Sequence, residues 1–409
     1  MNVDNRQRLL RIAFFTYSTR PRGGVVHTLE LAEHIQDLGH DVHVFALGKD
    51  EKGFFRPTSL PSTFIPCIMG ERDESLDDRI QRYIDTYYQF LVNHLETSFD
   101  IYHTQDCVSA NALWHASEKG LFPFFIRTIH HVDDFVSPRL IQCQKDSIYR
   151  PEHRLVVSKY WKARLMSEFG VDSHIIHNGV DISRFRPPTD AQRKGARKKL
   201  DVSGKTVFLS IGGIEPRKNS IRLVTAFNSA RRQLLAQGLD PILLIAGGET
   251  LFDYTPYRTE FFGWLHDSEL EIGKDILLLG TVKDEQIPEL YHAADGLLFP
   301  SVKEGWGLVV LEAMASGLPV LTSDIPVFKE YLQHEENAIM VSAEDESSIA
   351  AGIEKLAIDL KLKQRLASSG PKTAELYSWE STAKAHLEYY YELLSAKSKP
   401  LFQHEFRCE

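Results

Sequence analysis

The chain has 409 residues, and because single hydrophobic cores stop growing at about 250–300 residues, we expect two domains with a cleft between them. Its composition, 43% hydrophobic and 25% charged, is that of an ordinary globular protein and excludes the disordered and fibrous classes. The formal net charge of −9 argues against a general nucleic-acid binder, which usually carries a basic excess over a whole domain.

The cysteines and the N-terminus indicate the compartment. Neither C-x-x-C spacing nor the spacing of a zinc site occurs among them, and a chain of this length has no need of disulfides, so we expect reduced cytosolic thiols. They are Cys67, Cys107, Cys143 and Cys408. MNVDNRQRLL has no apolar core of signal-peptide length, and no run approaches the roughly 18 apolar residues of a membrane span. We therefore expect a cytoplasmic protein, at most peripheral at a membrane.

The chain opens on a strand, a loop, a helix and a second strand. RIAFFTY (Arg11–Tyr17) is a short apolar run followed by the turn residues TRPRGG. Apolar side chains then recur with helical spacing and stop at Gly39, and VHVFAL (Val42–Leu47) follows as the next strand. This order predicts parallel strands joined by a right-handed crossover.

The first half continues in the same alternation. A helix is expected near Arg79–Leu95, and then come the apolar runs DIYHTQD, FPFFIRTIHH and RLVVSKY, each ending in polar residues. Ligands of open parallel sheets gather at such strand ends. Asp106, at the end of DIYHTQD, lies where a cleft is expected, although aspartate at such a place is mostly a turn or cap residue.

A second series of strands follows, which predicts a second doubly wound sheet. It begins with TVFLSIGG and continues with PILLIAGG, DILLLGTV and DGLLFPSV, separated by helical stretches such as SIRLVTAFNSARRQLL. Asn178–Pro188 contains glycine and proline without apolar periodicity, so we place the linker there. WESTAKAHLEYYYELL (Trp379–Leu394) predicts a long final helix with Ser378 as its N-cap.

Two acidic residues flank a glycine-rich helix start in FPSVKEGWGLVVLEAMASGLPVLTSD. Gly305 and Gly307 stand where a strand gives way to a helix, and the free amides and positive dipole end there favour an anion such as phosphate. Glu304 lies just outside the helix and Glu312 about one and a half turns inside it. A carboxylate is a good acceptor for sugar hydroxyls, so we expect glycines and amides to hold diphosphate and the glutamates to hold sugars. The alternative for Glu304 alone is an acid that only complements the helix dipole.

A basic pair follows the first strand of the second series, in IGGIEPRKN. Gly212 and Gly213 permit close approach of the backbone, and Arg217 and Lys218 carry the positive charge that binds diphosphate. A basic pair after a turn is usually a solvated surface, but its place behind a strand-terminal glycine pair favours the binding interpretation.

Together these stretches resemble the family-4 retaining glycosyltransferases of the GT-B architecture, which have two Rossmann-like domains facing across a cleft. The resemblance covers the chain from Arg11 to about Leu394, and its most specific part is the E-x7-E element from Glu304 to Glu312. Similar to the family as well are GGVVH near Gly23, TIHH, HNGVDISRFRP and EPRKN, and the last helix resembles one that crosses back to the first domain. The resemblance implies an α/β fold with an N-terminal acceptor domain, residues 1–183 plus the crossover helix 379–397, and a C-terminal donor domain, residues 184–378.

For the donor side, the resemblance implies roles residue by residue. Glu304 would contact the transferred sugar and Glu312 the nucleotide ribose, while Arg217 and Lys218 would bind the diphosphate and stabilise it as it leaves. The diphosphate would also meet the backbone amides of Gly305, Trp306, Gly307 and Leu308. The donor would carry UDP, GDP or ADP, chosen by backbone geometry around residues such as Val282.

On the acceptor side, Gly24 would be the loop glycine that passes close to the donor phosphate and the acceptor, and His130 would reach a sugar hydroxyl of the donor. The family often has His-Asp where this chain has His130-His131 followed by Asp133 and Asp134, and an Arg right after the glycine where this chain has Gly213. Both histidines also have a purely structural alternative, which is the favoured one for His131.

The resemblance implies hexose transfer from a nucleotide-diphosphate sugar to an acceptor hydroxyl (of a glycan, a small molecule or a lipid-linked sugar) with retention and without metal or other cofactor. A dehydrogenase would need G-x-G-x-x-G after the first strand, where TYSTRPRGG stands. A phosphorylase would need a cofactor lysine that the sequence does not single out. An epimerase, or a non-catalytic sugar-nucleotide-binding protein, remains the alternative on the same fold. RKGARKK (Arg193–Lys199) is expected to be a solvated helix face, with weak contact to anionic lipid as the alternative.

Overall fold

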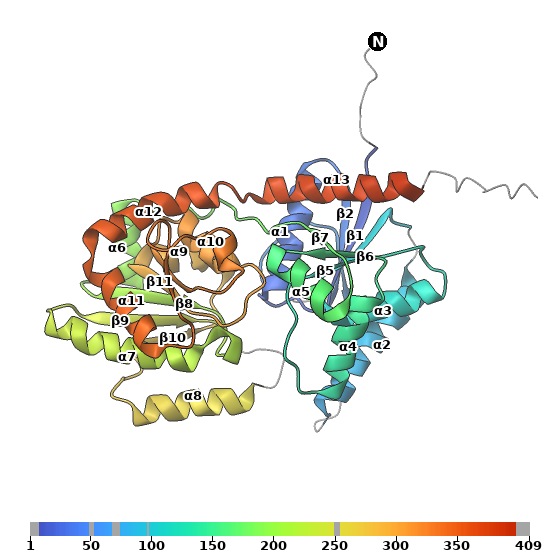
Figure 1. Cartoon of the computed structure of the whole chain (residues 1–409). Helices are drawn as coiled ribbons and strands as arrows, with labels where there is room; N and C mark the ends of the chain where they lie inside the picture. The colour runs from blue at the N-terminus through green and yellow to red at the C-terminus, as the bar shows by residue number, and fades with distance from the viewer. Residues whose placement is uncertain (1–7, 49–52, 68–73, 96–97, 249–253, 398–409) are drawn as a thin grey trace, which may run out of the picture.

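The computed structural model describes residues 8–48, 53–67, 74–95, 98–248 and 254–397. These residues form two parallel sheets in two lobes that lie side by side (Figure 1). We call the part built around the first sheet the N-lobe and the part built around the second sheet the C-lobe. The expected α/β architecture of two Rossmann-like units is confirmed.

The N-lobe sheet has the strand order β3-β2-β1-β4-β5-β6-β7, with every pairing parallel. Its strands are β1 (Arg11–Thr16), β2 (Asp41–Leu47), β3 (Ser62–Ile65), β4 (Ile101–Thr104), β5 (Ile126–Ile129), β6 (His153–Val156) and β7 (His174–Ile175). Its helices are α1 (Gly23–Asp37), α2 (Leu76–His94), α3 (Cys107–Glu118), α4 (Pro138–Tyr149) and α5 (Lys159–Phe169).

Both faces of this sheet are covered, which explains why its strands are continuous apolar runs. In β1, Ile12 and Phe14 belong to the cluster that includes α1, whereas Ala13 and Phe15 belong to the cluster under α2, α3 and α4. Strands buried on both faces have no polar side to alternate with. The sequence pattern therefore predicts the strands but not which helix covers which face.

The C-lobe sheet has the order β10-β9-β8-β11-β12-β13 and is again parallel throughout. Its strands are β8 (Thr206–Ile211), β9 (Pro241–Ala246), β10 (Ile276–Gly280), β11 (Gly296–Phe299), β12 (Val320–Ser323) and β13 (Ile339–Val341). Its helices are α6 (Asp190–Lys199), α7 (Ser220–Ala236), α8 (Thr255–Asp267), α9 (Ile287–Ala293), α10 (Leu308–Ala315), α11 (Glu346–Ile358) and α12 (Leu360–Ala374), with short 3₁₀ turns η2 (Pro216–Lys218), η3 (Asp284–Gln286) and η4 (Phe328–Glu330).

Apolar packing joins the two lobes. One continuous cluster of buried side chains contains Val157 and Trp161 from the N-lobe together with Trp306 and Val310 from the C-lobe. Polar contacts add to it, because the carboxylate of Glu330 accepts hydrogen bonds from the first backbone amides of α5, those of Lys159 (3.0 Å) and Tyr160 (2.9 Å). The helix start of one lobe is thus held by an acid of the other.

The last helix, α13 (Trp379–Lys397), leaves the C-lobe and lies along the N-lobe beside α1 (Figure 1). It begins at Ser378, whose hydroxyl accepts from the amide of Ser381 at 3.1 Å, as its expected N-cap role requires. Leu387 and Tyr390 enter the N-lobe core. The phenol of Tyr390 lies 2.6 Å from Nδ1 of the buried His103 in β4. The division of the chain at residues 183 and 184 stays a prediction.

The linker region is better packed than its composition suggests. Val180 forms a parallel bridge with Ser378, and Gly179 faces the start of α13 so closely that a Cβ there would lie 2.3 Å from the amide nitrogen of Trp379. Asn178 is buried, and its side-chain oxygen lies 2.9 Å from Nδ1 of His27 in α1. The linker therefore fixes where the last helix crosses between the lobes.

The cysteines and the expected absence of a membrane span can be checked only within the described residues. Cys107 and Cys143 are free thiols, the sulfur of Cys67 accepts from Nη1 of Arg82 at 3.0 Å, and Cys408 lies outside the described residues. Among the helices that the structure describes, none is long and apolar enough to cross a bilayer.

Candidate active site

The two sheets direct their carboxyl ends toward a shared cleft. In each sheet the strand order reverses between the first strand and its neighbour, β1 and β4 in the N-lobe and β8 and β11 in the C-lobe. Loops diverge at such switch points and leave a crevice for ligands. A cavity of about 800 Å³ lies there, and it is lined by the loops that follow these strands from both lobes. All of the expected site residues line it: Gly24, His130, Gly212, Gly213, Arg217, Lys218, Val282, Glu304, Gly305, Trp306, Gly307, Leu308 and Glu312.

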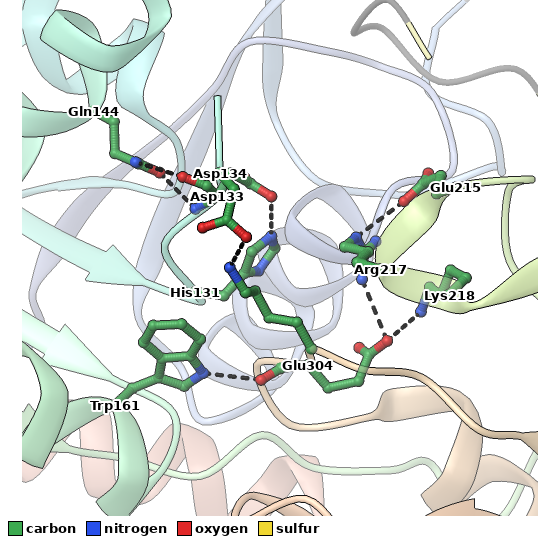
Figure 2. Close-up of polar contacts among 10 residues, drawn as sticks. His131, Asp133, Asp134, Gln144, Trp161, Glu215, Arg217, Lys218 and Glu304 are labelled. Atoms are coloured by element: carbon green, nitrogen blue, oxygen red, sulfur yellow. Dashed lines mark hydrogen bonds and ion pairs between the residues drawn. The ribbon is translucent and has the colours of Figure 1, made fainter. Parts of the chain in front are cut away.

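Glu304 is the centre of a charged cluster on the C-lobe wall, shown in Figure 2. Its Oε1 accepts from Nζ of Lys218 at 2.7 Å and from Nη1 of Arg217 at 3.3 Å. Arg217 also pairs with Glu215, whose Oε2 lies 2.9 Å from its Nε. Arg217 and Lys218 end the 3₁₀ turn η2 directly after β8, so the strand-end glycines and the basic pair are part of one loop.

The charges in this cluster depend on one another. Burial alone would raise the pKa of Glu304, but the positive charges of Lys218 and Arg217 outweigh it and lower the pKa below the usual range. For Lys218 the balance is opposite, because burial lowers its pKa despite the Glu304 carboxylate. Its ammonium also lies 4.3 Å from the ring centre of Phe299. An ionised carboxylate and two cations thus share one buried corner of the cleft.

The start of α10 lies at the cavity beside this cluster. Gly307 is the N-cap residue with φ +93°, and neither a capping side chain nor an acid occupies the first turn, which begins at Leu308. A side chain at Gly307 would also meet the ring of Phe328, since a Cβ would lie 2.7 Å from Cε1. The free amides of this turn can therefore receive an anionic group.

Gly305 brings the opposite lobe into contact. A Cβ at this position would lie 2.4 Å from the backbone oxygen of His130, so only glycine fits. Trp161 of the N-lobe donates from Nε1 to the backbone oxygen of Glu304 at 2.9 Å (Figure 2). The loop that carries the catalytic candidate is therefore positioned by the backbone and an indole of the other lobe.

Glu312 lies inside α10 and faces the same cavity. Burial raises its pKa, and the phenol of Tyr291 in α9 donates to its Oε2 at 2.6 Å. The partner matters because a carboxylate held by one phenol keeps further acceptor positions for hydroxyl groups of a ligand. Val282 lines the cavity as well, in the loop after β10.

The glycines after β8 are needed for close packing of backbone and side chain. Gly212 has φ +151°, and a Cβ there would lie 3.1 Å from Cε of Lys218. Gly247, the residue after β9, faces it even more closely, because a Cβ would lie 2.0 Å from the Gly212 oxygen. Gly213 follows with the cavity on one side. The Lys218 stem thus runs over glycine backbone toward Glu304.

The two histidines of TIHH have different surroundings in the N-lobe wall. Nε2 of His130 lies 3.2 Å from Oε1 of Gln105, and a Cβ at Gly24 would lie 3.8 Å from its ring. Burial, together with the positive charge of Arg127, keeps the pKa of His130 well below its usual value, so the ring is neutral. His131 lies 3.2 Å from Oδ1 of Asp133, whose amide donates to Gln144 (Figure 2). Both rings line the cavity.

Sequence reasoning missed several contributors to the site. Glu215 belongs to IGGIEPRKN, so the motif itself could have indicated it. Trp161 and Tyr291 carry no local signal, because the partner of Trp161 lies more than a hundred residues away and that of Tyr291 lies 21 residues away. Asp106 is the N-cap of α3, as expected, accepting from the amide of Ser109 at 2.7 Å, and it lines the cavity as well.

The basic run in α6 is partly neutralised within the C-lobe. Arg193 and Arg197 both pair with Asp295, at 2.6 and 2.5 Å, and Lys199 pairs with Glu289 at 2.5 Å. The helix is therefore not a wholly solvated face, and contact of its remaining lysines with anionic lipid stays a prediction. No group of three or more metal-ligating side chains gathers in the described ranges, and the expected metal-free reaction stays a prediction.

Comparison with known proteins agrees with this geometry in both lobes. The family model described as Glycosyltransferase Family 4 matches residues 21–184, and the one described as Glycosyl transferases group 1 matches residues 192–373. An uncharacterized glycosyltransferase of Methanocaldococcus jannaschii is 25% identical, over 93% of this chain and 98% of its own. A D-inositol 3-phosphate glycosyltransferase of Rhodococcus erythropolis is 24% identical, over 93% and 90%.

Solved structures share the two-lobed fold. Sucrose-phosphate synthase from Thermosynechococcus elongatus superposes with a TM-score of 0.76 at 20% identity, covering 95% of this chain and all of that chain. HepE of Anabaena, solved in complex with UDP and glucose, gives 0.75 at 17% identity, covering 94% of this chain and all of its own. With both lobes matched and the E-x7-E element at the cleft, the chain belongs to the family-4 glycosyltransferases and has the GT-B fold.

Proposed function

We propose that the protein transfers a hexose-type sugar, with retention at the anomeric carbon, from a nucleotide-diphosphate donor to an acceptor hydroxyl. The observation that carries the proposal is the buried cluster of Glu304, Lys218 and Arg217 beside the open start of α10. It offers a carboxylate for sugar hydroxyls and, next to it, two cations and free amides for a diphosphate.

In this proposal the donor lies mainly on the C-lobe wall. Glu312 binds the ribose, the amides from Gly305 to Leu308 bind the diphosphate, and Glu304 binds the sugar that moves. Arg217 and Lys218 exchange part of their contact with Glu304 for contact with phosphate oxygens. Their charge then grows in importance as the diphosphate departs, which is the kind of stabilisation that dominates such reactions.

The bond changes follow from retention without a protein nucleophile. The bond from the anomeric carbon to the diphosphate oxygen breaks, and the acceptor oxygen forms its bond on the same face of the sugar. The acceptor proton passes to the departing phosphate oxygen. His130, neutral because of its burial, hydrogen-bonds a donor hydroxyl from the N-lobe, and closure of the cleft excludes water.

The names of the relatives support the substrate classes without fixing them for this chain. HepE is described in complex with UDP and glucose and, in a further structure, with UDP-glucose. The Rhodococcus relative is named for an inositol phosphate. A sugar nucleotide as donor and a hydroxylated small molecule as acceptor are therefore the first pair to try.

The first test is a thermal-unfolding panel with UDP, GDP, ADP and their common sugar conjugates. A ligand that binds only the folded protein raises its stability by RT ln(1 + [L]/Kd), about 2.7 kcal/mol at a concentration one hundred times Kd. We expect one nucleotide series to raise the unfolding temperature, and Glu312→Ala to remove most of that rise. Glu344→Ala, which changes an exposed glutamate of the same lobe, serves as the matched control.

Transfer itself is checked with the nucleotide that binds. Lys218→Ala and Glu304→Ala should each lower sugar transfer by at least 100-fold. The first removes a positive charge that stabilises the departing diphosphate, and the second removes the carboxylate that binds the moving sugar. Full transfer activity in both variants would overturn the proposal. Donor consumption that needs no acceptor would favour an epimerase, and binding without turnover would favour a non-catalytic protein.

A further inference from the structure

Arginine side chains gather on the N-lobe wall of the cavity, away from the basic pair of the C-lobe. Arg20 and Arg22 come from the loop between β1 and α1, Arg79 from α2 and Arg127 from β5, and all four line the cavity. Arg79 has a carboxylate partner, Glu74 at 3.8 Å. The proposed donor site uses none of the four, so this wall needs an explanation of its own.

Arg127 is the most deeply placed of them. Its residue surface is 7% exposed, one guanidinium nitrogen donates to the backbone oxygen of Thr128, and its Nε is buried with no hydrogen-bond partner among the described residues. Burial lowers the pKa of Arg127. The negative charge of Asp106 offsets part of the cost of burying this cation, but the Nε–H has no acceptor within the described chain, and a buried polar group without a hydrogen-bond partner is costly.

Arg22 repeats the feature from the next loop. Its Nε and Nη2 are both buried and lack partners within the described part of the chain. Arg22 is also the N-cap residue of α1, a helix start without a capping side chain and without an acid in its first turn. The positive end of that helix therefore adds to the two guanidinium groups.

The acids near these arginines are already engaged. Asp106, whose negative charge acts on Arg127, accepts from the backbone amides of Tyr17 at 2.8 Å and Ser109 at 2.7 Å, and burial raises its pKa. Asp133 is held by His131. Tyr17 also lines the cavity, and burial raises its pKa, so the phenol keeps its proton and is a donor. The wall thus presents donors and positive charge, and the neighbouring acids Asp106 and Asp133 already have other hydrogen-bond partners.

We propose that this wall binds a phosphate-type anion on the acceptor, with Arg22 and Arg127 as its main contacts and the first turn of α1 and the Tyr17 phenol around it. That the anion belongs to the acceptor rests on the proposed function, since the donor diphosphate is assigned to Arg217 and Lys218 on the opposite wall. The acceptor is then a phosphorylated hydroxyl compound, either a soluble polyol or sugar phosphate or the headgroup of a phospholipid.

Calorimetric titration with inorganic phosphate tests the site without any turnover. The full chain is first saturated with the nucleotide that stabilises it, so that the donor site is occupied, and ionic strength is held constant with chloride. We expect Arg127→Gln and Arg22→Gln each to weaken phosphate binding by about tenfold or more, as the loss of a charged hydrogen bond does. Arg150→Gln, an exposed arginine of α4's end in the same lobe, should bind phosphate as the parent does.

A second readout separates a binding role from a structural one. If Arg127 is kept for a ligand, Arg127→Gln should unfold without ligand at the same temperature as the parent or higher, because a buried charge with an unsatisfied Nε–H has been removed. The proposal would be overturned if Arg127→Gln lost much of its stability and Arg22→Gln still bound phosphate as tightly as the parent. Phosphate binding that disappears in Lys218→Ala but persists in both arginine variants would also overturn it, because the anion would then lie in the donor site.

The two sources of the anion are distinguished by competition. Inositol phosphate should displace inorganic phosphate from the parent and be used as an acceptor better than inositol by at least tenfold, a preference that Arg127→Gln abolishes. If phosphatidylinositol vesicles compete instead and the soluble compound does not, the acceptor is a lipid headgroup. If no nucleotide binds at all but phosphate binding still depends on Arg22 and Arg127, the proposed function fails and the anion site stands.

Discussion

Gly305 links the catalytic loop of the C-lobe to the backbone of the N-lobe. Because a Cβ there would meet the His130 oxygen at 2.4 Å, Gly305→Ala should push the lobes apart rather than unfold either of them. Misplacement of reacting groups by about 1 Å can lower a rate on the order of 100-fold, and we expect a loss of sugar transfer of that size. Steady-state kinetics with the stabilising nucleotide sugar would measure it.

Gly195 provides the matched control, since it lies in the exposed middle of α6 with open space where its Cβ would be. Gly195→Ala should leave transfer unchanged and stabilise the protein by about 1 kcal/mol, the difference in helix propensity. Equal activities of the two alanine variants would show that the Gly305 contact has no part in the reaction.

At this scale the sequence predicted the motif residues but not their partners. Glu304 with Lys218 and Arg217, and the start of α10, could be found because strand ends and glycines mark them locally, and the structure brings them together. Their roles in the reaction stay predictions. Tyr291, Arg22 and Arg127 were missed because their significance lies in burial and in what they do or do not pair with, which depends on contacts between distant segments.

Among the elements, α5 depends on a residue from the other lobe. The amide of Trp161 donates to the hydroxyl of Ser158, and the amides of Lys159 and Tyr160 donate to the carboxylate of Glu330 in η4. Glu330→Ala leaves two amides without their acceptor and removes a negative charge from a helix start, which should lower the free energy of unfolding by about 1 kcal/mol. Urea unfolding followed by circular dichroism would detect it.

Glu336→Ala is the comparison for that variant, because Glu336 is an exposed glutamate of the same lobe; its effect should stay within about 0.5 kcal/mol. The Glu330 effect should also shrink in high salt, as an interaction with a helix dipole does. If the two variants unfold alike at every salt concentration, Glu330 does not hold α5.

The elements themselves were largely predictable, and their arrangement was not. Apolar runs of β1, β2, β8 and β9 stand out because strands covered on both faces carry no polar residues. The strands β3, β7 and β13 were missed. The strand order and the helices that cover each face are set by pairings across the chain, which no local pattern contains.

At the scale of the whole molecule, the assignment of α13 to the N-terminal domain can be tested through Tyr390. Its ring lies in the N-lobe core and its phenol bonds His103 of β4. Tyr390→Ala should destabilise the N-lobe by about 3–5 kcal/mol, as large-to-small changes in cores do. Hydrogen exchange should rise in β1, β4 and β5, while β8 and β9 of the C-lobe keep their protection.

Glu388→Ala, on the exposed side of the same helix, should change neither lobe by more than about 0.5 kcal/mol. Faster exchange confined to the C-lobe strands in Tyr390→Ala would show that α13 belongs energetically to the C-lobe, and the predicted domain division would be wrong.

The crossing of α13 also sets the order in which the protein can be completed during its synthesis. The ribosome releases the N-lobe strands first, yet the surface that receives Leu387 and Tyr390 stays uncovered until about two hundred further residues have been made and the C-lobe has folded. Contacts as distant in sequence as that between His103 and Tyr390, 287 residues apart, form late and slow the final step of folding. A nascent chain that stalls inside the C-lobe would carry an exposed apolar face, the kind of surface that chaperones bind.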